Sequence, residues 1–249
     1  MPAPRFAALS DIHGNRWALE AILEDLARRR IRRVVNLGDC VYGPLDPGGT
    51  AEMLLRLDWP TVRGNEDRLL DESGTDTQTS PSLQFTRERL LPHHLAWLRE
   101  LPLTLSTSEG FFLCHGTPTC DDDYLLFEAT PTGLHRRPVR DLSAMLVDVP
   151  STGLLCGHDH TPASVELDDG RVIVNPGSVG LPAYEAEEPH HHVIENRTTH
   201  ARYAILEPAD RGWLVEQRAV PYDWQAAAAA ARAHGRPDWA FWLSGRATA

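Results

Sequence analysis

The stretch FAALSDIHGNRWAL, residues 6–19, joins an apolar run to a helical pattern through a short polar turn. Residues 6–9 are all apolar, which is typical of a buried strand. From Arg16 to Arg30, apolar residues recur at helical spacing and basic residues gather at the C-terminal end. We therefore predict a strand, a polar corner and an amphipathic helix, in that order.

The same alternation continues along the next 45 residues. A second apolar run at 34–37 enters a Gly-Asp turn, TAEMLLRLD at 50–58 indicates a second helix, and PTVRGN at 60–65 predicts a third strand and corner. Strands that alternate with helices imply βαβ units and a parallel sheet. Ligands of such sheets bind beyond the carboxyl ends of the strands, so the polar corners are the expected place for a site.

The remainder of the chain is less regular but still mixed. Two further apolar runs, GFFLCHG at 110–116 and GLLCGHDH at 153–160, end in turns that contain glycine and histidine. ASVELDDGRVIVNPG at 163–177 predicts a hairpin with Asp169-Gly170 as its turn. Further predicted elements are a helix over 83–101, antiparallel strands over 201–207 and 212–220, a helix over 224–235, and surface loops over 71–82 and 182–199. We see no internal repeat and no interdomain linker, and we expect one domain over residues 1–249.

Composition excludes several classes of protein. The net charge is -11 and the chain has no basic run, which argues against an extended nucleic-acid surface but not against a nucleotide held by a metal. The N-terminus lacks the apolar core of a signal peptide, and no apolar run approaches the roughly 18 residues of a membrane span. We therefore expect a cytoplasmic protein without a membrane partner, and we make no choice between monomer and homo-oligomer. The four cysteines form no CxxC pair and are expected to be small buried hydrophobes.

Five consecutive junctions between a strand and a loop carry a carboxylate, an imidazole or an amide beside glycine. The candidates are Asp11 and His13, Asp39 after Gly38, Asn65 after Gly64, His115 before Gly116, and His158 and His160 after Gly157. In extended chain, an i, i+2 pair places both side chains on one face. Histidine and carboxylate together suit first-row metals such as Mn, Fe, Zn and Ni. Helix capping would explain Asn65 and the acids after it taken alone, but it does not explain five such corners.

With these motifs the chain resembles the calcineurin-like metallophosphoesterases, especially their small bacterial and archaeal phosphoesterase branch. LGDCVYGPLDP at 37–47 and VNPGSVGLP at 174–182 are similar to segments of that branch, and the resemblance runs from Phe6 to near Pro182. It implies an α/β fold, a four-layer α/β/β/α sandwich of two mixed β-sheets flanked by helices. A dinuclear metal centre is expected at one edge of that sandwich.

The resemblance also implies a role for each corner residue. Asp11, His13 and His160 would hold one metal; Asn65, His115 and His158 would hold the other; and Asp39 would bridge the two. The implied cofactors are two divalent transition-metal ions, with Mn favoured and Fe, Zn or Ni as alternatives. The implied reaction is hydrolysis of a small phosphate ester, such as a nucleotide, by attack of a metal-bridging hydroxide. A phosphodiester is slightly favoured over a phosphomonoester, and the alternative function is a metal-binding scaffold or regulatory protein with little turnover.

One position departs from the commonest family pattern. Many members read G-N-H-D/E, and the histidine of that motif helps to protonate the leaving group, whereas this chain has Glu66 followed by Asp67. We place Glu66 with Asp39 and Asn65 as candidate catalytic residues. However, a glutamate is mostly ionised at neutral pH, and nearby cations favour that form, so we do not expect a strong general acid. The alternatives are a substrate whose good leaving group needs no proton donor, a proton supplied by a water, or a histidine from elsewhere, such as one in the 190–192 run.

Four other features have two interpretations each. Asp159 is either a hydrogen-bond partner of a ligand histidine or a solvent-facing loop acid. The acidic run at 121–123 is either a solvated loop or a lid that shapes the substrate site. Asn15 and Tyr42 follow predicted ligand turns and could contact substrate, although Asn15 could equally cap the first helix.

Overall fold

The computed structural model describes residues 5–71 and 80–248. In its N-terminal part the elements are β1 (Phe6–Leu9), α1 (Arg16–Arg29), β2 (Val34–Asn36), α2 (Pro47–Leu57), α3 (Asn65–Asp71), α4 (Pro81–Arg87) and α5 (Pro92–Glu100). The middle part contains β3 (Thr104–Ser106), β4 (Phe111–Cys114), β5 (Phe127–Thr130), β6 (Gly133–Arg136), α6 (Val139–Met145), β7 (Gly153–Leu155), β8 (Ala163–Glu166) and β9 (Val172–Asn175). The C-terminal part contains β10 (Ala183–Ala186), β11 (His192–Glu195), β12 (Ala201–Pro208), β13 (Trp213–Val220), α7 (Trp224–Ala233) and α8 (Pro237–Trp242).

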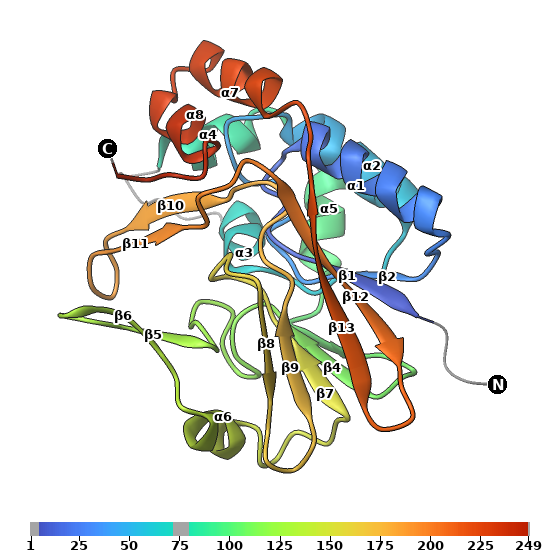
Figure 1. The fold of residues 1–249 in the computed structure, drawn as a ribbon. Helices are drawn as coiled ribbons and strands as arrows, with labels where there is room; N and C mark the ends of the chain where they lie inside the picture. Colours follow the sequence, from blue (N-terminus) through green and yellow to red (C-terminus); the bar gives the residue numbers. More distant parts are fainter. Residues whose placement is uncertain (1–4, 72–79, 249) are drawn as a thin grey trace.

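Two main sheets pack face to face, with helices outside them (Figure 1). The first sheet has the strand order β13-β12-β1-β2 and the second has β3-β4-β7-β9-β8. Strands β1 and β2 are parallel, as are β4, β7 and β9, while β12 pairs antiparallel with β1, β3 with β4, and β8 with β9. The predicted α/β sandwich of two mixed sheets is therefore confirmed. In the part of the chain that the structure describes, no helix has both the length and the apolar character of a membrane span.

Alternation along the strands produces the layers. In β1, Ala7 and Leu9 face the core that includes α1, whereas Phe6 and Ala8 face the core between the sheets. The side chains of β7, in the second sheet, alternate in the same way. Leu155 faces the core between the sheets, and Leu154 faces the core that includes α6. A strand buried on both faces must be apolar throughout, which explains the uniform run at 6–9.

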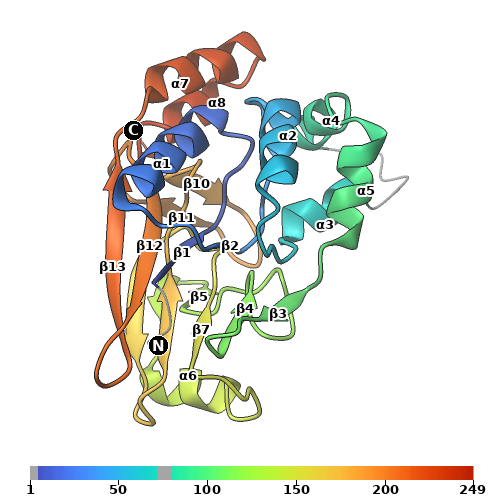
Figure 2. The ribbon, with the colours of Figure 1, turned by 90° about the vertical axis from the view of Figure 1, so that its right-hand side faces the viewer.

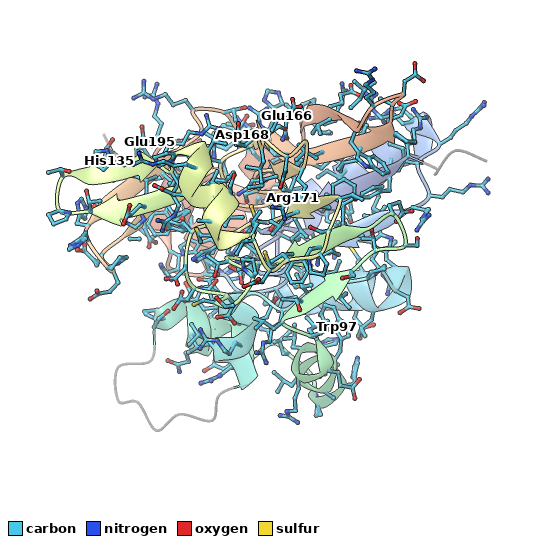
Figure 3. All side chains as sticks on the ribbon, turned by 90° about the horizontal axis from the view of Figure 1, so that it is seen from below. Trp97, His135, Glu166, Asp168, Arg171 and Glu195 are labelled. Atoms are coloured by element: carbon cyan, nitrogen blue, oxygen red, sulfur yellow. The ribbon has the colours of Figure 1, made fainter. Side chains whose placement is uncertain are left out.

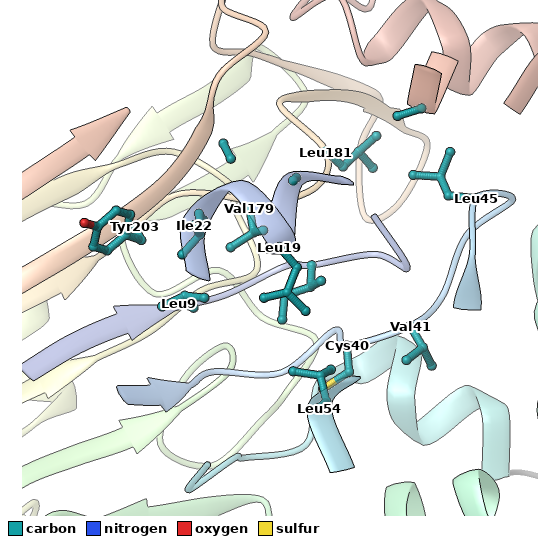
Figure 4. Packing of buried hydrophobic residues seen from close by; sticks show 14 of the residues in the cluster. Leu9, Leu19, Ile22, Cys40, Val41, Leu45, Leu54, Val179, Leu181 and Tyr203 are labelled. Atoms are coloured by element: carbon teal, nitrogen blue, oxygen red, sulfur yellow. The ribbon is translucent and has the colours of Figure 1, made fainter. Parts of the chain in front are cut away.

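The helix-side core is the largest of the three. Leu19 and Ile22 of α1 pack with Leu9 of β1 and Tyr203 of β12, all fully buried (Figure 4). Helices α7 and α8 lie over the same layer (Figure 1), and α3, α4 and α5 stand together along one side of the molecule (Figure 2). These helices bring parts of the chain that are distant in sequence to the edge where the parallel strands end.

The opposite end of the molecule is closed by the β8–β9 hairpin and α6. Arg171, next to the hairpin turn, donates from Nη1 to the carbonyls of Leu146 and Val149 just after α6 (Figure 3). Its Nε donates to Asp169 at 2.7 Å. The predicted hairpin over 163–177 is confirmed, and its turn also satisfies carbonyls at the end of a helix.

Three predicted elements were wrong. Residues 60–65 form only an isolated bridge between Thr61 and Asn36, because the next donor along, Arg63 N, bonds to the carbonyl of Pro102 instead. The helix over 83–101 divides into α4 and α5, since Pro92 lacks an N–H and forces Leu91 into extended conformation. The loop over 182–199 contains the antiparallel hairpin β10–β11, whose inner residues include the buried Ile194.

Two further predictions have a different outcome. Most of the polar loop predicted over 71–82 lies outside the described residues. The division of the chain into a single domain stays a prediction. The antiparallel strands predicted over 201–207 and 212–220 and the helix predicted over 224–235 are confirmed as β12, β13 and α7.

An aromatic cluster joins the two sheets and yields a stability prediction. The Phe111 ring lies 5.5 Å from the Phe6 ring and 4.9 Å from the Trp213 ring, both edge to face. Phe111→Ala should therefore lower the free energy of unfolding by about 3–5 kcal/mol, measured by urea denaturation. Leu214→Ala, at a position that is 63% exposed on β13, should change it by less than about 0.5 kcal/mol. Similar losses for both variants would contradict a core between the sheets.

Candidate metal centre

The polar corner residues meet at the edge of the sandwich where the parallel strands end. The ligand atoms of Asp11, His13 and His160 lie within 4.8 Å of one another. Asp39, His115 and His158 form a second group with the same spacing, and Asp39 also belongs to a third group with His13 and Glu66. Of the seven predicted ligands, Asp11, His13, Asp39, His115 and His160 are buried, whereas Asn65 and His158 are partly exposed.

The histidines point one particular nitrogen into the site. Nδ1 lies near a backbone carbonyl in His13 (Tyr42 O, 3.2 Å), His115 (Leu37 O, 2.7 Å) and His160 (Leu181 O, 2.6 Å). Nδ1 therefore carries a proton, and Nε2 faces the site, which is the arrangement found in metal-ligating histidines.

Two observations show that these residues fit a cation. The Nε2 atoms of His13 and His160 lie 3.1 Å apart, close enough for one ion to contact both. Among the described residues, the buried Nε2 of His115 has no hydrogen-bond partner. A divalent cation bound beside these nitrogens would satisfy all three.

The two carboxylates lie between the imidazoles. Asp39 Oδ2 is 3.4 Å from His115 Nε2 and 4.0 Å from His13 Nε2, so it reaches both ligand groups. Asp11 Oδ1 is 3.3 Å from His160 Nε2 and 3.9 Å from His115 Nε2. Asp39 therefore lies between the two groups of candidate ligands.

The backbone at the site is strained. Asp11, His13, Asp39, His158 and His160 have φ angles of 56°, 52°, 53°, 70° and 55°, in the left-handed region that non-glycine residues seldom adopt. Each such residue costs about 1–2 kcal/mol. Five of them in one site indicate turns that direct side chains to a common point.

The corners after β2 and before α3 approach each other closely. A Cβ on Gly38 would lie 2.5 Å from Gly64 N and 3.0 Å from His115 Nδ1, so only glycine fits there. Asp67 then joins the two corners, because its carboxylate accepts the N–H groups of Asp39, Cys40 and Gly64 at 2.9–3.0 Å. The sequence gives no pattern that predicts this role, beyond the presence of an acid in the first turn of α3.

Asn65 does not cap α3. Its Oδ1 is buried and finds no hydrogen-bond donor within residues 5–71 and 80–248, and its Nδ2 donates to Asp122 Oδ1 at 3.0 Å. The capping interpretation of Asn65 is therefore wrong. It is correct for Asn15, whose Oδ1 accepts Ala18 N at the start of α1 and whose Nδ2 donates to Gly180 O.

The imidazoles and carboxylates of the site shift one another's pKa values in opposite directions. Burial alone would lower the pKa of the two histidines nearest the carboxylates, but Glu66 raises the pKa of His13 to about 9 and Asp39 raises the pKa of His115 to about 10. Burial would raise the pKa of Asp11 and Asp39, but the neighbouring imidazoles hold both below their usual range. The metal-free site is thus a network of paired charges.

Glu66 faces His13. Its Oε2 lies 3.0 Å from His13 Nδ1, whose proton is directed to the Tyr42 carbonyl. Burial, with the charge of Asp39 in support and that of His13 opposed, raises the pKa of Glu66 to about 7 in the metal-free protein. Cations bound beside it would lower that pKa again.

A cavity of about 490 Å³ opens over these residues. Its lining includes His13, Asp39, Asn65, Glu66, His158 and His160. Tyr42, Tyr124, Tyr184, Trp239 and Trp242 supply aromatic walls, and Arg137 and Arg236 supply cations. Trp239 and Trp242 come from α8, and the sequence does not reveal their role, because no local pattern connects them with corners that lie 79 or more residues earlier in the chain.

The remaining candidates separate clearly. His192 is buried and its Nε2 lies 2.8 Å from the hydroxyl of Tyr124, whose ring packs on His158, so this histidine reaches the site only through Tyr124. His191 pairs with Glu185 on the exposed β10–β11 hairpin. Asp159 is fully buried and accepts Thr161 N, so the prediction of a solvent-facing acid is wrong.

Comparison with known proteins places the chain in a family. Residues 5–199 match the family model of the calcineurin-like phosphoesterase superfamily domain. The chain belongs to the calcineurin-like phosphoesterases. The resemblance read from the corner motifs is therefore confirmed, and with it a family of hydrolases that act on phosphoester bonds and are typically dependent on divalent metals.

Three known proteins illustrate what this calcineurin-like phosphoesterase is similar to. It is similar to a metallophosphoesterase from Sphaerobacter thermophilus, with 25% identity and a TM-score of 0.78 over 97% of this chain and 99% of the other. A hypothetical protein from Pyrococcus horikoshii shares 21% identity and a TM-score of 0.75 over 98% of each chain. An uncharacterized protein of Methanocaldococcus jannaschii is 26% identical over 201 residues, which cover 71% of this chain and 76% of that protein.

The raised histidine pKa values predict how the stability of the metal-free protein depends on pH. A group with a raised folded-state pKa stabilises the fold fully below its unfolded pKa, here 6.5, and loses that effect as the pH rises through its folded value. After metal removal with EDTA, the Tm measured by circular dichroism should therefore fall between pH 6.5 and 10. His115→Asn should make the fall shallower. A Tm that is flat or rises over this range would contradict the charge network.

Proposed function

We propose that this protein is a metal-dependent phosphodiesterase with a dinuclear centre held by Asp11, His13, Asp39, Asn65, His115, His158 and His160. The observation that supports this most directly is the shared position of Asp39 between two His/Asp groups whose Nε2 atoms face inward. Manganese is the proposed metal, with Fe, Zn or Ni as alternatives, because imidazole and carboxylate donors suit all four.

The proposed ligands contribute charge and a fixed orientation of their donor atoms. Asp39 would supply negative charge to both cations, and Asn65 would offer a neutral oxygen, so the loaded centre would keep net positive charge for an anionic substrate. Divalent cations bound there would supply Lewis-acid chemistry for the attack of a water on phosphorus. The Nδ1–carbonyl bonds of His13, His115 and His160 keep the imidazoles in the tautomer and orientation that ligation needs.

The charge of the cavity favours a diester. Carboxylates outnumber arginines on its lining and include Glu128, Glu185 and Glu188. A phosphodiester carries one negative charge at neutral pH, whereas a phosphomonoester carries nearly two, so the carboxylates of the cavity wall disfavour the monoester more strongly, even though cations at the centre would attract both. The aromatic walls suit a planar group such as a nucleobase, and a small nucleotide-like ester is the proposed substrate class.

A scaffold or regulatory protein with little turnover is the alternative function. Its support is the glutamate at the position of the common family histidine. Against it, a pure scaffold has no need of five strained left-handed residues that direct ligand atoms into one cavity.

The test of the proposed function is hydrolysis by protein loaded with two Mn²⁺ ions. We expect bis-p-nitrophenyl phosphate to be hydrolysed with a higher kcat/KM than p-nitrophenyl phosphate. Asp39→Asn, at the shared ligand, should reduce bound metal and hydrolysis together. Absence of hydrolysis of either substrate by protein shown to hold two metals would favour the scaffold, and a preference for the monoester would reverse the assignment of substrate class.

A second prediction concerns Glu66. With cations bound it should be ionised and should not deliver the proton to the leaving group, so Glu66→Gln should lower kcat by less than about tenfold and leave the basic limb of the pH–rate profile in place. Loss of a general acid would instead cost about 10²–10⁴-fold. A loss of that size, with disappearance of the basic limb, would make Glu66 the proton donor.

A further inference from the structure

The amide of Asn65 has a definite orientation. Its oxygen faces away from solvent and lacks a hydrogen-bond donor anywhere in the described chain, whereas its nitrogen donates to Asp122 Oδ1 at 3.0 Å. Of the two ends of an amide, only the oxygen has lone pairs for a cation. The observed orientation is therefore the one that a ligand needs, and the reverse orientation would direct two N–H donors at the metal site.

Asp122 is suited to enforce this orientation. An ionised carboxylate can only accept hydrogen bonds, so it stabilises the amide with the nitrogen toward it. If the amide were reversed, its oxygen would face the carboxylate oxygen at the same distance, and two acceptors would repel each other. An asparagine or serine in place of Asp122 would not discriminate in this way, because each can also donate.

The loop that carries Asp122 is attached to the same helix as Asn65. Arg68 of α3 donates from Nε to both oxygens of the buried Asp121, at 3.0 and 3.2 Å. Its Nη2 lies 3.9 Å from Asp122 Oδ2. The acidic run at 121–123 is thus docked on α3 through its first residue, which holds the exposed Asp122 beside Asn65.

We propose that Asp122 is a positioning residue that selects the metal-binding orientation of the Asn65 amide. The inference rests on the proposed role of Asn65 as a metal ligand. It gives the loop after β4 two functions, since the loop begins with the predicted ligand His115 and then supplies the residue that orients another ligand. It refines the earlier interpretation of the acidic run as a solvated loop, since Asp121 is buried and Asp122 and Asp123 are exposed, but Asp122 has a definite partner in Asn65.

The test is Mn²⁺ binding to metal-free protein by isothermal titration calorimetry. Asp122→Ala should weaken the second Mn²⁺ site, the one that Asn65 would share with His115 and His158, by about 10–100-fold. This is the range found when a residue that orients a metal ligand is removed. Asp123→Ala removes a neighbouring carboxylate of the same run and should weaken binding by less than about threefold, which is a small electrostatic effect at an exposed position. Both positions are exposed, so the Tm of the metal-free variants should stay close to that of the parent.

A second background separates orientation from charge. In an N65D background the ligand has two equivalent oxygens, so its orientation no longer matters and Asp122→Ala should not weaken the site further. Equal losses from Asp122→Ala in both backgrounds would show that Asp122 acts by charge alone and would overturn the proposal. Equal losses from Asp122→Ala and Asp123→Ala would do the same.

The result for Asn65 itself tells the two proposals apart. If Asn65→Ala removes the second Mn²⁺ site while Asp122→Ala leaves it intact, the positioning role is wrong and the ligand assignment stands. If Asn65→Ala leaves Mn²⁺ binding unchanged, Asn65 is not a ligand and the inference is overturned with that assignment. Because binding is measured without substrate, the result is independent of whether the protein hydrolyses phosphodiesters.

Discussion

The buried carboxylate of Asp67 is the contact on which the geometry of the site depends. It accepts three backbone N–H groups, two from the corner after β2 and one from the corner before α3. Without it, these donors would be buried without partners, at a cost of about 1–3 kcal/mol each. Gly38 and Gly64 leave the space that lets the corners come so close. As a result, Asp39 and Asn65, which follow different segments of chain, line the same cavity.

The site concentrates features that oppose folding. Five non-glycine residues have left-handed backbone, and two carboxylates lie among imidazoles at the bottom of the cavity. Two things offset this. The sandwich beneath the site has three apolar cores, and the buried charges alternate in sign so that each carboxylate lies near an imidazole. The arrangement is understandable for a centre that is completed by cations, since they would neutralise the carboxylates and engage the inward-facing Nε2 lone pairs.

The part of the cavity above the predicted ligands is built from later segments of the chain. Tyr184 of the β10–β11 hairpin packs on His160, and the Trp239 ring of α8 lies 5.9 Å from that of His13. The family match ends at residue 199, so α8 lies beyond it. In this molecule the corners that gather the predicted ligands belong to the shared family region, and part of the wall that would meet a substrate does not.

The sequence predicts features that depend on neighbouring residues better than features that depend on contacts between distant residues. The uniform run at 6–9, the helical spacing after Arg16 and the Gly-Asp and Gly-His corners are local patterns. They predicted strands alternating with helices and the seven corner residues, and the family that these corners resemble implied the sandwich and the ligand roles. Local rules failed where a distant partner decided the outcome. Arg63 N bonds to Pro102 O and ends the expected third strand. Asn65 does not cap α3, because its Nδ2 donates to Asp122 and its buried Oδ1 accepts no hydrogen bond from the described residues. The orientation of Nε2, the Asp67 clamp, the Asn65 amide and the α8 wall were decided only by tertiary structure. Each is a contact between residues whose separation in space depends on the packing of the whole chain, and a local sequence pattern carries no information about that separation.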